Sequence, residues 1–235
     1  MGVFQFKEFS VQQDKNPMKV GTDGILLGAW VDCGGMGRAL DVGTGTGLIA
    51  LMMAQQNSTM QVDGVEISEV AYLEALDNVK ESSFKERITL YNDSIQNFAS
   101  NSKDKFDLIV SNPPFFTGGT MSNNMDKQLV RHTVKLSHAD LLRSVSSLLS
   151  VGGSFAVIVP FLEGLRFIEI AESYNLNLSK KTKVRSGQGS KIVRLLLSFS
   201  KGSVAEIEEN DFYLYNEDKT RSTDFRELTQ DFYLS

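Results

Sequence analysis

The sequence contains little cysteine, histidine or proline, and it has no long apolar run. Its 235 residues include one cysteine, Cys33, two histidines and four prolines. A single cysteine excludes an internal disulfide and a zinc site built from cysteines. No stretch approaches the length that crosses a bilayer, and the first ten residues lack the apolar core of a signal peptide. We therefore expect a cytoplasmic protein without a metal or a membrane partner.

The composition is that of an ordinary globular protein, with 41% hydrophobic and 23% charged residues. Strand-like and helix-like patterns alternate along most of the chain. Strands are expected at 38–43, 61–67, 87–91, 106–111, 154–160, 177–185 and 191–200, and helices at 47–56, 69–82, 138–150 and 161–174. This alternation predicts an α/β fold in which helices cover both faces of a mostly parallel sheet. The last two strands form a predicted hairpin, which would add an antiparallel strand at one end.

Two segments lie outside this pattern. Before the sheet, residues 4–11 alternate like a strand, and Thr22 or Asp23 is expected to cap a short helix. After the sheet, aromatic-rich runs at 212–215 and 232–234 are expected to pack against its edge. A chain of this length predicts a single domain, residues 1–235.

A glycine-rich turn follows the first predicted strand of the sheet, in the sequence Asp41-Val42-Gly43-Thr44-Gly45-Thr46-Gly47. Glycines let the backbone approach a ligand, and the following helix offers free N–H groups at its positive end. The dinucleotide fingerprint would need its third glycine at position 48, which is a leucine. Asp41 has no role beside a pyrophosphate, but beside S-adenosylmethionine it can hold the ammonium group or order waters. We predict that this cofactor contacts Asp41, Gly43, Gly45 and Gly47; a plain strand–helix turn is the alternative.

Polar side chains also end the next two predicted strands. Glu66 follows the glycines by about 20 residues, the spacing at which an acid accepts hydrogen bonds from ribose hydroxyls. A nicotinamide enzyme would place an acid there too, so Glu66 does not identify the cofactor. Asp93 ends the third strand, where we expect it either to reach the adenine amino group or to cap the following helix. Both residues are assigned to the predicted cofactor site.

The fourth predicted strand ends in Asn112-Pro113-Pro114-Phe115. An amide-like nitrogen is a poor nucleophile because its lone pair is delocalised, so an enzyme that methylates it should accept hydrogen bonds from its amino hydrogens. Asn112 and the Pro113 carbonyl supply acceptors, and neither proline has a competing N–H. Phe115 can stack on a planar base. These four residues predict the catalytic site, with Asn112 also near the cofactor; the alternative is a rigid turn that ends a strand.

The chain resembles class I S-adenosylmethionine-dependent methyltransferases of the N6-adenine type, and more narrowly the bacterial tRNA(Val) (adenine-37-N6)-methyltransferases. The resemblance covers residues 4–200 and the run 232–234. Besides the glycine turn, it rests on Phe6, Phe9 and the segments 19–24, 26–30, 64–67 and 112–116. It implies a Rossmann-like fold with a seven-stranded, mostly parallel sheet and an antiparallel closing strand.

The same resemblance implies roles for the parts of the chain. Residues 1–36 would cover the cofactor and substrate, 37–200 would form the catalytic core, and 201–235 would be a C-terminal extension. Lys19, Thr22 and Asp23 would lie over the cofactor and help to close its site. The implied substrate is the adenine beside the anticodon of a tRNA. That base must be turned out of its stack, which a single-stranded loop makes inexpensive. A monomer is favoured.

A basic stretch supports an RNA partner, although the net charge of the chain is −5. No acidic residue lies between Glu172 and Glu206, where basic residues are frequent. A local basic patch on an acidic protein can still attract a polyanion. With Phe115, we assign four of these residues to substrate binding: Lys180, Lys181, Lys183 and Arg185. The alternative is that they are the solvated faces of two strands.

Three other functions fit parts of the pattern. The Asn112 tetrad resembles that of enzymes which methylate protein glutamine, as in a release factor, or guanine amino groups in RNA. The glutamine enzymes carry a larger helical domain in front, whereas fewer than 40 residues precede the first core strand here. A binding module that kept the cofactor fold without activity would not need the tetrad.

Overall fold

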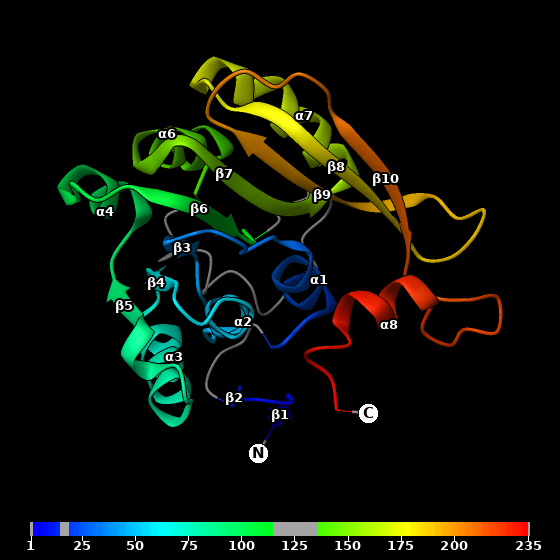
Figure 1. Cartoon of the computed structure of the whole chain (residues 1–235), viewed down its shortest axis with the longest axis horizontal. Helices are drawn as coiled ribbons and strands as arrows, with labels where there is room; N and C mark the ends of the chain where they lie inside the picture. The colour runs from blue at the N-terminus through cyan, green and yellow to red at the C-terminus, as the bar shows by residue number, and fades with distance from the viewer. Residues whose placement is uncertain (1, 15–18, 115–135, 235) are drawn as a thin grey trace, which may run out of the picture.

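The strands of the computed structural model form an eight-stranded sheet in the order β10-β8-β9-β7-β6-β3-β4-β5 (Figure 1). The structure describes residues 2–14, 19–114 and 136–234. The strands of this sheet are β3 (Arg38–Val42), β4 (Gln61–Glu66), β5 (Ile88–Asn92), β6 (Phe106–Ser111), β7 (Leu149–Pro160), β8 (Asn177–Arg185), β9 (Ile192–Ser200) and β10 (Glu208–Tyr213). Neighbouring strands run parallel except where β9 pairs with β7 and β8. The central strands, such as β3 and β6, are mostly apolar because both faces of the sheet are covered there.

Helices form a layer on each face of the sheet (Figure 1). One layer contains α4 (Ile95–Asn101), α6 (His138–Leu148) and α7 (Phe161–Ala171), and the other contains α1 (Thr22–Trp30), α2 (Leu48–Gln56), α3 (Glu69–Glu81) and α8 (Thr223–Thr229). Short 3-10 turns lie at Lys85–Arg87 and Glu172–Tyr174. Each layer buries its own apolar cluster against the sheet. Phe155, Phe167 and Phe199 are fully buried in the first cluster, and Leu26, Leu51 and Met52 in the second.

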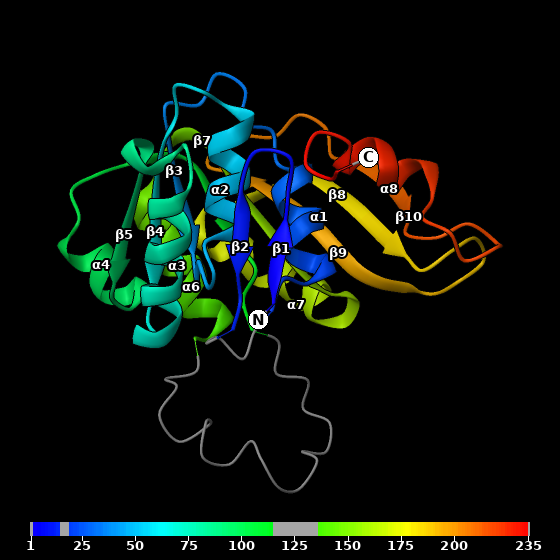
Figure 2. The same cartoon turned by 90° about the horizontal axis from the view of Figure 1, so that it is seen from below.

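The helix α2 is apolar on every side, and its residues 48–54 are all buried. A helix of this kind needs packing partners all around it. The outer partners are α1 and an N-terminal hairpin of β1 (Val3–Gln5) and β2 (Ser10–Gln12). Phe6 and Phe9 of this hairpin are buried and stacked, with ring centroids 4.6 Å apart. Figure 2 shows the hairpin in front of α2, with β2 on the side of α3.

The predicted α/β fold with a mostly parallel sheet is confirmed, but two details differ. The antiparallel strand β9 lies between β7 and β8 instead of at the edge, because it pairs with both of these strands. The sheet also has eight strands instead of seven, because β10 pairs in parallel with β8. The segment that forms β10 is rich in Glu, Asn and Asp, which are depleted in strands, so its sequence did not predict one.

The predicted cap of α1 is wrong, and so is the alternative in which Asp93 caps the helix after β5. The N-cap of α1 is Gly21, which makes no side-chain hydrogen bond, and Thr22 and Asp23 lie within the first turn of the helix. The N-cap of α4 is Ser94, whose hydroxyl accepts a hydrogen bond from the Asn97 N–H at 3.2 Å. Asp93 therefore precedes the cap instead of forming it.

The two C-terminal aromatic runs have different neighbours. Phe212 lies in the edge strand β10 and is buried, as expected for packing at the sheet edge. The run 232–234 packs instead against the N-terminal hairpin. Tyr233 lies 6.0 Å from the ring of Phe4, and the Lys7 N–H donates to the Phe232 carbonyl at 2.8 Å. The two ends of the chain thus stabilise one another.

Candidate active site

The three strands that end in the predicted site residues are neighbours in the sheet. The order β6-β3-β4 places the carboxyl ends of these parallel strands side by side, at spacings of about 5 Å. The chain runs outward in both directions from β3, so the gap between β3 and β6 is the topological switch point, where α/β sheets bind ligands. At their ends, the Ser111 hydroxyl donates to the Val42 carbonyl at 2.9 Å and joins β6 to β3.

The glycine turn after β3 is held in a conformation that its glycines make accessible. Gly43, Gly45 and Gly47 have φ angles of 73°, 56° and 85°, in the left-handed region that favours glycine. The Gly43 N–H donates to the Val65 carbonyl at 2.8 Å, and the Gly47 N–H donates to the Thr44 carbonyl at 2.8 Å. Gly47 is the N-cap of α2, so the turn leads directly into the helix's free N–H groups.

Asp41 is completely buried beneath this turn. Its Oδ2 accepts a hydrogen bond from the Thr44 hydroxyl at 2.6 Å, whereas its Oδ1 has no hydrogen-bond partner among the described residues. Burial raises the pKa of Asp41 to about 7; the Thr44 hydrogen bond and the nearby Ala50 N–H lower the pKa, and the charge of Glu66 raises it. An unpaired buried acceptor is costly unless a ligand or water donates to it. Oδ1 therefore fits the predicted ammonium or water contact of the cofactor.

Glu66 is buried at the end of β4, with both carboxylate oxygens fixed by backbone donors. Its Oε2 accepts from the Gly45 N–H at 3.0 Å and its Oε1 from the Ser68 N–H at 2.8 Å. An ionised carboxylate has about four acceptor sites, so capacity is left for ribose hydroxyls. On the next strand, the half-buried Asp93 accepts from the Ser94 N–H at 2.7 Å. A contact from Asp93 to adenine stays a prediction.

Asn112 directly follows β6 and is half-buried, Pro113 is buried, and Pro114 is exposed. Its amide lies against the first turn of α1: a Cβ built on Gly24 would be 3.8 Å from Asn112 Nδ2. Phe115, the fourth residue of the predicted catalytic motif, lies outside the described residues. The structure thus brings Asn112 to the same edge of the sheet as Asp41 and Glu66, and its catalytic role stays a prediction.

The segment before α1 lies beside Asn112, but its predicted cofactor contacts stay predictions. Lys19 is exposed, and Thr22 and Asp23 begin α1. The Asp23 carboxylate accepts a hydrogen bond from Arg194 Nε on β9 at 2.8 Å. This ion pair fastens the start of α1 to the sheet, and it balances the Asp23 charge beside the predicted site.

The four predicted RNA-binding side chains of β8 are paired with acids of β10. The distances are 3.2 Å for Lys180–Glu208, 2.6 Å for Lys181–Glu209, 3.0 Å for Lys183–Glu209 and 2.8 Å for Arg185–Asp211. Because side chains alternate along a strand, Lys180 lies on the opposite face from the other three. There its ammonium group is 5.2 Å from the centre of the Trp30 ring. These contacts reduce the positive charge that the stretch presents, and RNA binding by it stays a prediction.

Asn78 on α3 is a buried polar residue that the sequence patterns did not bring forward. Its side chain contacts both β2 and the glycine turn through three hydrogen bonds. The sequence pattern that could have identified Asn78 is the helical spacing that places its amide on the buried face of α3, with Ala75 and Val79. The hydrogen bond from Thr44 to Asp41 was not predicted either, because only the position of Thr44 in the glycine turn pointed to it.

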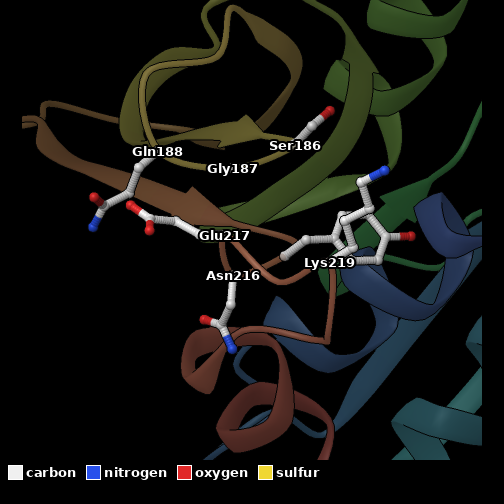
Figure 3. Close-up of a pocket in the computed structure, with 7 residues that line it drawn as sticks. Ser186, Gly187, Gln188, Asn216, Glu217 and Lys219 are labelled. Carbon is white, nitrogen blue, oxygen red and sulfur yellow. The ribbon is translucent and has the colours of Figure 1, made fainter.

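A groove that includes none of the predicted site residues lies between the β8–β9 loop and the segment after β10 (Figure 3). Its lining residues include Ser186, Gln188, Asn216 and Glu217. In the described ranges, no group of three or more His, Cys, Asp or Glu side chains is arranged to hold a metal ion. No helix in the same ranges is long and apolar enough to span a bilayer.

Comparisons with known proteins bear on the family and the fold of this chain. A family model described as a methyltransferase small domain matches residues 23–163. A protein of Histophilus somni named tRNA1(Val) (adenine(37)-N6)-methyltransferase is 40% identical over 233 residues, which are 99% of this chain and 97% of that protein. A predicted O-methyltransferase from Agrobacterium tumefaciens has a similar structure, with a TM-score of 0.72, 18% identity and coverage of 89% of this chain and 96% of that one.

A second solved structure, a putative class I S-adenosylmethionine-dependent methyltransferase from Listeria monocytogenes, gives a TM-score of 0.57 at 16% identity. The match covers 86% of this chain and 67% of that one. At these identities the two structures support the fold alone.

Proposed function

The chain belongs to the family of tRNA1(Val) (adenine(37)-N6)-methyltransferases, and from this we propose that it transfers the methyl group of S-adenosylmethionine to N6 of adenine 37 in tRNA(Val). The observation that carries the proposal is the placement of Asn112 at the switch point of the sheet. Asp41 ends the neighbouring strand β3 and Glu66 ends β4, the strand beyond it, so the proposed amino-group site and the proposed cofactor site share one edge.

The cofactor would be held by side chains and backbone that are already in place. The glycine turn and the free Asp41 Oδ1 suit its amino acid end, and Glu66 suits the ribose. Lys19, Thr22 and Asp23 would cover it from the start of α1, and Asp93 would meet the adenine. When bound, S-adenosylmethionine supplies a methyl group on a positively charged sulfur, which an amino nitrogen can accept with loss of a proton to water.

The Asn112 motif would orient the amino group. The side-chain oxygen of Asn112 and the Pro113 carbonyl accept hydrogen bonds from the two amino hydrogens, which turns the nitrogen lone pair toward the methyl group. Alignment of the two reacting atoms contributes up to about 7–11 kcal/mol. No side chain has to remove a proton before transfer, because the methylated product loses it readily.

The substrate side of the proposal includes the anticodon loop of the tRNA. Phe115 would stack on the turned-out adenine, a contact of about 1–3 kcal/mol. Lys180, Lys181, Lys183 and Arg185 would contact phosphates once these compete with the acids of β10. We propose that the protein acts in the cytoplasm as a monomer and without a metal. In this proposal, residues 1–36 cover the site, residues 37–200 catalyse the reaction and residues 201–235 extend the sheet.

The test uses labelled S-adenosylmethionine and total tRNA from cells that lack this gene. Label should enter tRNA and appear as N6-methyladenosine after digestion. Asn112→Ala should abolish the label while the affinity for S-adenosylhomocysteine stays within about twofold, because the amide acts on the nitrogen and not on cofactor binding.

Other outcomes would redirect the proposal. Label in a release-factor protein and none in tRNA would contradict it and favour glutamine methylation, and label in guanine would change the target base. A large loss of cofactor affinity in Asn112→Ala would move that residue from the catalytic site to the cofactor site.

A further inference from the structure

The side chain of Asn78 joins two segments that are distant in the sequence. The residue is 1% exposed. Its Oδ1 accepts a hydrogen bond from the Gln12 N–H at 2.8 Å, and its Nδ2 donates to the Gln12 carbonyl at 3.0 Å and to the Thr46 carbonyl at 2.9 Å. Both donors of the amide are therefore in use. Asn78 pairs with the edge strand β2 as another strand would, and it also holds the glycine turn.

The contact to the turn fixes one peptide unit at both ends. The Thr46 carbonyl accepts from Asn78, while the Gly47 N–H of the same peptide donates to the Thr44 carbonyl at 2.8 Å. This peptide joins Thr46 to Gly47, and both Gly47 and the nearby Gly45 have left-handed φ angles. Glycine leaves the backbone free to rotate, so these two hydrogen bonds set the orientation of this peptide, while Val65 and Glu66 hold the earlier part of the turn.

The contact to β2 continues to Asn112. Next to Gln12, the Gln13 side-chain oxygen accepts from the Val20 N–H at 2.6 Å. Val20 precedes Gly21, the N-cap of α1. The first turn of α1 then brings Gly24 against the amide of Asn112. Hydrogen bonds and short stretches of chain thus connect the glycine turn, through Asn78, β2 and the start of α1, with the segment that lies beside the predicted catalytic residue.

We propose that Asn78 is a positioning residue for cofactor binding, which sets the orientation of the glycine turn and, through Gln13, the segment that covers the cofactor. The inference rests on the proposed function only through its cofactor, and it is independent of the methyl acceptor. A side chain that merely stabilised the fold would lower the melting temperature without a selective effect on cofactor affinity.

Asn57 provides the matched control. It is the C-cap of α2, at the end of the helix away from the glycine turn. Its Nδ2 donates to the Cys33 and Met36 carbonyls at 2.8 and 3.0 Å and its Oδ1 accepts from Thr59 and Met60, so its loss removes at least as many hydrogen bonds as the loss of Asn78. The assay is isothermal titration of S-adenosylhomocysteine without RNA, together with the melting temperature of each variant.

Both Asn78→Ala and Asn57→Ala should lower the melting temperature. Only Asn78→Ala should weaken cofactor binding, by about tenfold or more, and Asn57→Ala should stay within about twofold. Asn78→Asp keeps the shape but loses the donors to two carbonyls, so its Kd should rise at least as much. Equal affinities in Asn78→Ala and the wild type, or equal losses in Asn78→Ala and Asn57→Ala, would overturn the proposal.

Gln13→Ala keeps the test decisive if the Asn78 variants fail to fold. Gln13 is half-buried near the surface, so its loss should leave the melting temperature nearly unchanged while Kd rises about threefold. Because both residues act in one chain of contacts, the double variant should bind no more weakly than Asn78→Ala alone. An unchanged Kd in Gln13→Ala, or additive losses in the double variant, would contradict the proposal. Since no RNA is present, failure of the tRNA assay would leave this result intact.

Discussion

Asp41 should make the stability of the cofactor-free protein fall as pH rises, and Asp41→Asn should remove this effect. Burial raises the pKa of this carboxyl from 3.8 to about 7 in the folded protein. Between these two values, the unfolded chain has released the proton while the folded chain retains it. The unfolded state therefore binds fewer protons, and the free energy of unfolding decreases with pH until it levels off above about pH 7.

The size of this effect follows from the two pKa values. At about 1.36 kcal/mol per pKa unit, the difference between 3.8 and about 7 amounts to about 4 kcal/mol of unfolding free energy at full ionisation. Relaxation of the site and entry of water into it make this an upper value. The cause is the complete burial of the carboxyl, which the hydrogen bond from the Thr44 hydroxyl offsets only in part.

The assay is urea unfolding of both proteins between pH 5 and 8 without cofactor. Comparison with Asp41→Asn isolates this carboxyl from others with a raised pKa, such as Asp63. S-adenosylhomocysteine should also bind the wild type more tightly as pH rises toward about 7, because its ammonium group favours the ionised carboxylate. Parallel stability curves for the two proteins across this range would refute the reasoning.

Two further predictions concern the packing of α1 and the charges of β10. Gly28→Ala should lower the free energy of unfolding by about 1–3 kcal/mol, because the added Cβ would lie 2.6 Å from Met52 Sδ. An unchanged midpoint of urea unfolding would show that the Met52 side chain moves aside without cost. Glu209→Gln should strengthen tRNA binding and steepen its salt dependence, because the substitution releases Lys181 and Lys183 from their ion pairs. An unchanged salt dependence in a filter-binding titration would show that the two lysines stabilise the sheet and do not contact the tRNA.

The sequence predicted the fold because its core strands are short apolar runs that alternate with helices. It did not predict β10, since the paired charges that hold this strand on β8 are visible only when the two segments lie side by side. The position of β9 was missed for a related reason. A hairpin pattern states that two strands pair, but the order in which they join a sheet depends on which edge is available.

The site was predicted to the extent that it depends on strand ends. Asp41, Glu66 and Asn112 each end a parallel strand, and such ends meet at one edge of a sheet. The helix caps were less predictable, because adjacent residues in each segment are plausible caps. The cap of α1 is Gly21 instead of Thr22 or Asp23, and the cap of α4 is Ser94 instead of Asp93.

By itself, the sequence determined the periodicity of the elements, the position of the glycine turn and the identities of the groups at the strand ends, because these depend on neighbouring residues. Only the tertiary structure decided which charges are opposed and which polar atoms are buried. In the folded chain, the basic residues of β8 form ion pairs with carboxylates, Asp41 Oδ1 has no hydrogen-bond partner among the described residues, and Asn78 connects β2 to the glycine turn. Those properties depend on atoms far apart in the chain, and burial sets their energies.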